Sequence, residues 1–90
     1  MKVIINCENL LNRKQAHDYL AQMLDLPEHY GRNLDALFDC LTELSDCAVT
    51  LTHTESLSQD SYGKRVRKVM EAAARSNPGL KLEFFSGEPN

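Results

Sequence analysis

Hydrophobic and polar positions along this chain repeat with two different spacings, which predict strands and helices in turn. Short apolar, β-branched runs are typical of strands and occur at residues 2–6, 48–53 and 80–86. Longer segments place apolar residues three or four positions apart, as on one helix face, between residues 12 and 27, over 34–45 and over 61–76. Strands that alternate with helices need crossover connections. The sequence therefore predicts an α/β fold with a small three-stranded parallel sheet packed with three to four helices.

Capping residues support the helix boundaries. Asn12 followed by Gln15 forms a capping-box pattern, and Asn33 is suited to cap the second helix. The third helix is expected to end at the Asn-Pro-Gly sequence of residues 77–79. Thr54 is expected to begin a single helical turn, the possible fourth helix, and residues 87–90 are expected to be frayed.

The length of 90 residues is that of one domain, spanning residues 1–90, with one modest core and little room for a deep substrate cleft.

The apolar run near the start is too short for a signal peptide or a membrane span, so we expect a cytoplasmic protein that does not bind membranes. Three cysteines without a metal-ligand spacing are expected to be reduced thiols, with Cys40 packed and Cys47 more accessible.

Charge is concentrated in one segment. The formal net charge is −3, from 13 acidic and 10 basic residues. Residues 28–46 contain five acids and one base, a net −4, so the remainder of the chain is +1. No Lys or Arg lies within residues 34–46.

We call the carboxylates of Asp35, Asp39, Glu43 and Asp46 the acidic ridge. The first three are four residues apart and share one helix face, and Asp46 follows the helix. Like charges at this spacing destabilise a helix, and acids near its C-terminal end oppose the helix dipole. The ridge is either a solvated face or a surface for a strongly positive partner, and we favour the second. A straight row on one helix suits neither a metal ion nor a pair of catalytic carboxylates.

Groups beside the ridge fit an interface. His29, Tyr30 and Gly31 place aromatic and backbone groups near the first carboxylates, and Phe38 borders the apolar stripe of the helix. Aromatic groups at the centre with charges around them are typical of protein interfaces.

Other motifs indicate no catalytic, cofactor or metal site. The bases Lys64, Arg65, Arg67 and Lys68 are interpreted as the solvated face of a helix, so we expect no direct nucleic-acid binding. His17 and His53 have no ligand spacing and are expected to be ordinary polar or half-buried residues. Without a phosphate loop or nucleophile motif, we expect a protein that is not an enzyme.

Residues 26–42, LPEHYGRNLDALFDCLT, resemble the signature L-P-x-x-Y-G-x-N-L-D-A-L-x-D of the barstar family of intracellular ribonuclease inhibitors. The resemblance implies a three-stranded parallel sheet with helices. It also implies a bacterial, antitoxin-like monomer that blocks a secreted ribonuclease of the barnase type before export.

The resemblance further implies a partner-binding surface in which Asp39 is the main anchor and occupies the place of a substrate phosphate. Together with the residues chosen from the charge pattern, the expected partner-binding residues are His29, Gly31, Asn33, Asp35, Phe38, Asp39, Thr42, Glu43, Asp46 and Glu71.

The chain departs from the family pattern at several positions. Family members often have Tyr at the position of His29 and Trp at those of Phe38 and Leu44, and Arg75 stands where another acid could be expected. A histidine in the interface is expected to make affinity depend on pH between about 5.5 and 7.5. Two alternatives stay open: a module of the same fold that binds a basic protein other than a nuclease, and nucleic-acid binding through the basic helix.

Overall fold

The three strands form one sheet whose two faces differ in burial. The computed structural model describes residues 1–88. The strands β1 (Lys2–Asn6), β2 (Cys47–Thr52) and β3 (Leu80–Phe84) are parallel and lie in the order β1-β2-β3. In β1, Val3 and Ile5 are buried whereas the alternate residues Lys2 and Ile4 are exposed. The alternation gives the sheet one covered face and one open face.

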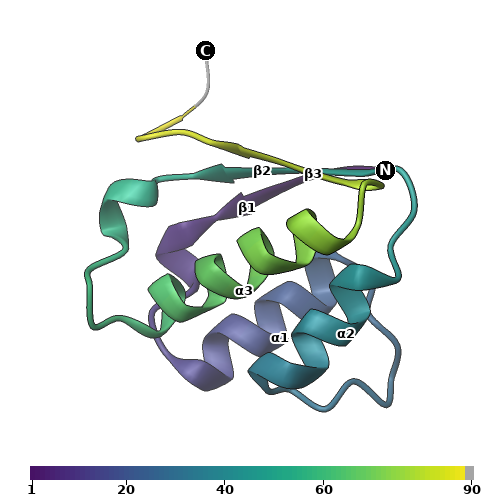
Figure 1. The fold of residues 1–90 in the computed structure, drawn as a ribbon. Coiled ribbons are helices and arrows are strands. Elements are labelled where there is room, and N and C mark those ends of the chain that lie inside the picture. Colours follow the sequence, from purple (N-terminus) through teal and green to yellow (C-terminus); the bar gives the residue numbers. More distant parts are fainter. Residues whose placement is uncertain (89–90) are drawn as a thin grey trace.

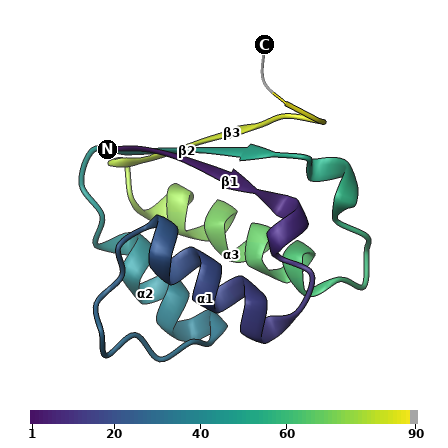
Figure 2. The same ribbon diagram turned by 180° about the vertical axis from the view of Figure 1, so that it is seen from behind.

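The α-helices lie together on one face of the sheet, as both views show (Figures 1 and 2). They are α1 (Arg13–Met23), α2 (Leu34–Thr42) and α3 (Tyr62–Ser76), with two short 3₁₀ turns, η1 (Cys7–Asn9) and η2 (Thr54–Ser56). Crossovers of one hand between consecutive neighbouring strands place their helices on one side. No helix in residues 1–88 is long and apolar enough to cross a membrane.

The core lies between the sheet and the helices. Ile5 and Leu51 pair across β1 and β2 and are fully buried. The helices contribute the fully buried side chains of Leu20, Leu37 and Met70. Because α2 and α3 pack side by side against this layer, their remaining faces point to solvent.

The predicted fold class is confirmed, with small differences at the element ends. The structure has three α-helices, and the possible fourth is the 3₁₀ turn η2. Helix α2 ends at Thr42, three residues before the predicted end. The Glu43 and Leu44 N–H groups donate to carbonyls only three residues back, which tightens the last turn and ends the helix.

The prediction that residues 87–90 are frayed is wrong for the two that the structure describes. The N–H of His53 donates to the Gly87 carbonyl at 2.9 Å, and the Gly87 N–H donates to the Glu55 carboxylate at 2.8 Å. The His53 imidazole also lies 2.8 Å from the Glu88 carboxylate. Residues 89 and 90 lie outside the described residues.

The prediction of an accessible thiol at Cys47 is also wrong. Cys47 begins β2, the central strand, where it is 1% exposed, and burial raises the pKa of its thiol. Cys40 is half-buried on α2, as expected, and its burial raises the pKa of that thiol as well. Being a protonated thiol at neutral pH, Cys47 is a packing residue.

Candidate functional site

The loop before α2 is anchored by Tyr30. Its N–H donates to the Pro27 carbonyl at 2.9 Å, and its side chain is 5% exposed. The hydroxyl lies 2.5 Å from Nδ1 of His17 on α1. Tyr30 therefore points inward and fixes the loop, and its small exposed part lines the hollow that Asp39 and Glu43 also line.

His17 is buried in the core, although its sequence context predicted an ordinary polar or half-buried residue. It is 1% exposed, and its second ring nitrogen, Nε2, lies 2.5 Å from the Tyr62 hydroxyl of α3. Burial is the main cause that lowers the pKa of His17, and the nearby charges of Arg13 and Arg32 lower it further. One signal was available, because His17 is three residues before Leu20 and so shares the apolar face of its helix.

The outer side of the loop is held by charge. Arg32 adopts a left-handed conformation with φ of 52° and donates from Nε to the Asp18 carboxylate at 2.9 Å. Tyr30 and Arg32 thus hold the loop through contacts with α1, and His29 and Gly31 between and beside them remain exposed. A Cβ on Gly31 would lie 3.2 Å from Cβ of Ala36, so the absence of a side chain lets the loop approach α2 closely.

Asn33 joins the loop to α2. Its side-chain oxygen accepts the Ala36 N–H at 2.8 Å, which caps the helix, and its amide donates to the Gly31 carbonyl at 3.2 Å. Both ends of its amide group therefore form hydrogen bonds within the chain. Asn33 shapes the surface from which the acidic ridge projects.

The acidic ridge is exposed along its whole length. Asp35 and Asp39 project from α2, Glu43 is its C-terminal capping residue, and Asp46 follows in a left-handed turn with φ of 49°. Within residues 1–88 none of these four carboxylates forms an ion pair. Asp35, Asp39 and Glu43 thus follow one another along α2 without an ion-pair partner among residues 1–88. Asp46 lies at the far end of the ridge, where the N-terminal ammonium donates to its backbone carbonyl at 2.6 Å and where it lines a separate hollow with Lys2 and Lys81.

A hollow of about 280 Å³ lies between the ridge and the loop. Its polar lining includes His29, Asp39 and Glu43, and Cys40 lies at its wall. The Glu43 and Asp39 carboxylates add to burial in raising the pKa of the Cys40 thiol, so their negative field reaches this wall. A cationic side chain entering the hollow would meet Asp39 and Glu43 together.

Two further predicted residues support the ridge. The Thr42 hydroxyl donates to the Asp39 backbone carbonyl at 2.9 Å. Phe38 is half-buried and packs against the edge of the core. Both lie on α2 beside the ridge, in the positions that the sequence predicts.

Glu71 is not brought to the ridge. On α3 it pairs with Arg67 at 3.9 Å, and the Arg67 guanidinium lies 4.2 Å from the ring centroid of Phe84 on β3. Arg65, about 120° away around the helix, lines a groove together with the start of α2, as Tyr62 also does. Glu71 therefore points toward β3, and its role in binding a partner stays a prediction.

Within residues 1–88 no group of three or more His, Cys, Asp or Glu side chains could hold a metal ion. The chemistry that the surface offers is therefore that of its charges, its hollow and its backbone.

Comparison with known proteins identifies the family of this chain. A family model described as "Barstar (barnase inhibitor)" matches residues 1–86. The chain belongs to the barstar family. A curated relative, "Putative ribonuclease inhibitor YrdF" from Bacillus subtilis (strain 168), is 39% identical over 84 residues, which cover 92% of this chain and 92% of the relative. The barstar-family signature thus occupies the loop and helix that carry the acidic ridge.

Proposed function

We propose that this protein inhibits a ribonuclease of the barnase type by covering its basic active site with the acidic ridge. The observation that carries the proposal is the row of exposed carboxylates, without an ion-pair partner among the described residues, beside a hollow of about 280 Å³. The family membership and the name of the relative supply the partner class.

In this mechanism Asp39 takes the place of a substrate phosphate. A ribonuclease active site binds RNA phosphates with cationic groups, so a carboxylate held at the same point satisfies those groups and excludes the substrate. The loop carrying His29 and Gly31 supplies shape and backbone groups at one side of the hollow. Glu43 and Asp46 lie farther along the ridge and steer the approach of the partner.

The remaining details of the proposal follow the family resemblance. The protein acts as a cytoplasmic, antitoxin-like monomer that binds a ribonuclease destined for secretion. It needs no cofactor for this role, because occlusion of a site requires only complementary charge and shape.

The proposal is tested by titrating the protein into a barnase activity assay. We expect activity to fall stoichiometrically. We expect Asp39→Ala to weaken binding by about 2 kcal/mol or more, roughly 30-fold, mainly through faster dissociation, because the cationic groups of the nuclease are left buried without a partner.

The matched control is Glu83→Ala, which changes the net charge equally but lies exposed on β3, away from the ridge. It should bind like the wild type. Equal binding by Asp39→Ala would show that Asp39 is not the anchor. Wild-type protein that inhibits no barnase-type ribonuclease, yet binds a basic protein through the ridge, would favour the alternative of a non-nuclease partner.

A further inference from the structure

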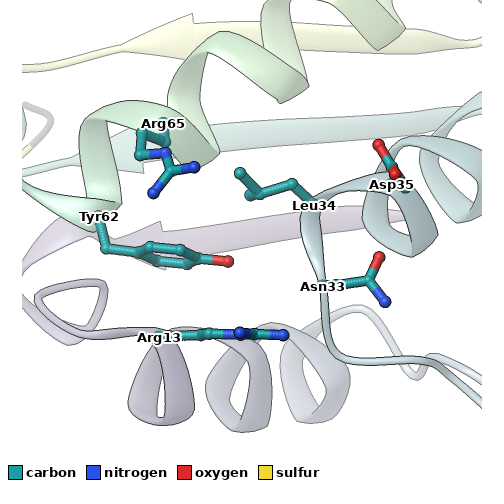
Figure 3. A pocket seen from close by; sticks show the side chains of 6 residues that line it. All are labelled: Arg13, Asn33, Leu34, Asp35, Tyr62 and Arg65. Atoms are coloured by element: carbon teal, nitrogen blue, oxygen red, sulfur yellow. The ribbon is translucent and has the colours of Figure 1, made fainter.

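A second, larger hollow lies on the other side of the start of α2. It is a groove of about 760 Å³ where the first turns of all three helices meet (Figure 3). Its lining residues are Arg13, Asn33, Leu34, Asp35, Tyr62 and Arg65. Asp35 is thus shared between this groove and the acidic ridge, which places the two features side by side on one surface.

The groove is basic on two of its walls. Arg13 comes from the first turn of α1 and Arg65 from the beginning of α3, and neither forms an ion pair with a carboxylate among the described residues. The Arg65 guanidinium lies 5.6 Å from the ring centroid of Tyr62, which supports it by a cation–π contact. Asp35 is the one carboxylate in the lining.

These arginines are placed against the helix dipoles. The N-terminal end of a helix carries partial positive charge, so a basic residue there is unfavourable. Neither α1 nor α3 has an acid in its first turn to compensate. Folding alone therefore gives no reason for two arginines at this point, just as it gives none for the acids at the C-terminal end of α2.

The sign of the charge restricts the partner. If the surface that meets the ridge were basic throughout, Arg13 and Arg65 would repel it, because both lie beside Asp35. We propose that the groove receives an Asp or Glu side chain of the same ribonuclease, carried next to its basic active site. The two guanidinium groups present planar forks that match a carboxylate. This inference rests on the proposed function and specifies the charge pattern of the partner.

The test is a double substitution, Arg13→Gln with Arg65→Gln, measured against barnase by stopped-flow association and by dissociation kinetics. We expect the Kd to rise at least tenfold, mostly through faster dissociation. The control Lys68→Ala with Lys81→Ala removes the same charge from two exposed positions outside the groove. It should change the Kd by less than twofold.

The opposite result is equally informative. An unchanged or tighter Kd for the glutamine variant would overturn the inference, because it would mean that the arginines face solvent or a basic surface. Wild-type protein that does not inhibit the nuclease would remove the proposed function and this inference with it. If the double variant does not fold by circular dichroism, each single variant is measured, with an expected rise of at least threefold.

Discussion

His17 shows how one buried side chain makes folding depend on pH. A neutral imidazole has one N–H and one acceptor nitrogen, so it can donate to one tyrosine hydroxyl and accept from the other. Both nitrogens of His17 have such a partner, in Tyr30 and Tyr62. Protonation would remove the acceptor and place a charge in the core, so the folded state favours the neutral ring.

The pH dependence follows from the lowered pKa of His17. Below the ordinary value of 6.5, the unfolded chain binds a proton that the folded protein binds less readily, so the free energy of unfolding should fall as the pH drops from 7.5 to 5. We expect His17→Gln to be less stable overall but to show a flatter dependence over this range. Urea unfolding at several pH values measures both quantities.

His53 provides the matched control, because hydrogen bonds to Glu88 and Glu55 raise its pKa. A raised pKa stabilises the folded protein at low pH, and this contribution is lost as the pH rises through the folded-state value. In His53→Asn, a substitution that suits the φ of 55° at this position, the free energy of unfolding should therefore fall more steeply with decreasing pH than in the wild type. A slope for His17→Gln equal to that of the wild type would contradict the assignment.

At the scale of single residues, sequence patterns predict the exposed acids well and the buried polar groups poorly. Asp35 and Asp39 follow from helical spacing alone, because exposure depends on the face they occupy. The bond between His17 and Tyr62 joins residues 45 positions apart. Such a contact depends on how helices pack, which local spacing does not determine.

Helix α2 carries the ridge and is held at both ends by asparagines. Asn33 caps its start. Asn77, at the end of α3, donates from its amide to the Leu41 carbonyl at 2.9 Å and to the Leu44 carbonyl at 2.8 Å. Asn77 therefore gives the Leu41 carbonyl a second donor beside the Leu44 N–H and supplies a donor to the Leu44 carbonyl just beyond the helix end.

We expect Asn77→Ala to lower the free energy of unfolding by about 2 kcal/mol, because two hydrogen bonds to the end of α2 are lost in a largely buried place. In a domain of this size, that loss lowers the melting temperature by roughly 8–16 °C. Asn77→Asp keeps the acceptor for the Gly79 N–H but turns a carboxylate oxygen toward the carbonyls, so it should be less stable than Asn77→Ala. An aspartate variant as stable as the wild type would show that these bonds contribute little.

The existence and order of the elements could be predicted because apolar spacing and helix caps act locally. Asn12 and Asn33 both cap the helices that they were expected to begin. The end of α2 was misplaced because apolar spacing continues to Leu44, whereas the backbone already tightens at Glu43 and Leu44 and its carbonyls there bind Asn77 from a distant segment. The same holds for the site. The acidic ridge could be predicted from the spacing of charged residues, whereas the groove could not, because it forms only where the starts of three helices come together.

Over the whole molecule, charge is unevenly distributed: residues 28–46, which contain the acidic ridge, have a net charge of −4, and the remainder of the chain has a net charge of +1. A partner with a basic cleft is attracted over distances limited by the Debye length, about 8 Å at physiological salt. The rate of association with the ribonuclease should therefore fall as salt increases, while dissociation changes little.

Removing the two acids at the far end of the ridge tests this steering without touching the proposed anchor. We expect Glu43→Ala with Asp46→Ala to slow association roughly two- to fivefold at low salt and to flatten its salt dependence, because both carboxylates act on the approaching partner through solvent. Stopped-flow association with barnase from low salt to about 1 M measures the slope, and the wild-type and variant rates should converge at the high end. Asp60→Ala with Glu83→Ala removes equal charge from exposed positions outside the ridge and should retain most of the wild-type slope. If both double variants flatten the slope equally, net charge and not the ridge steers association.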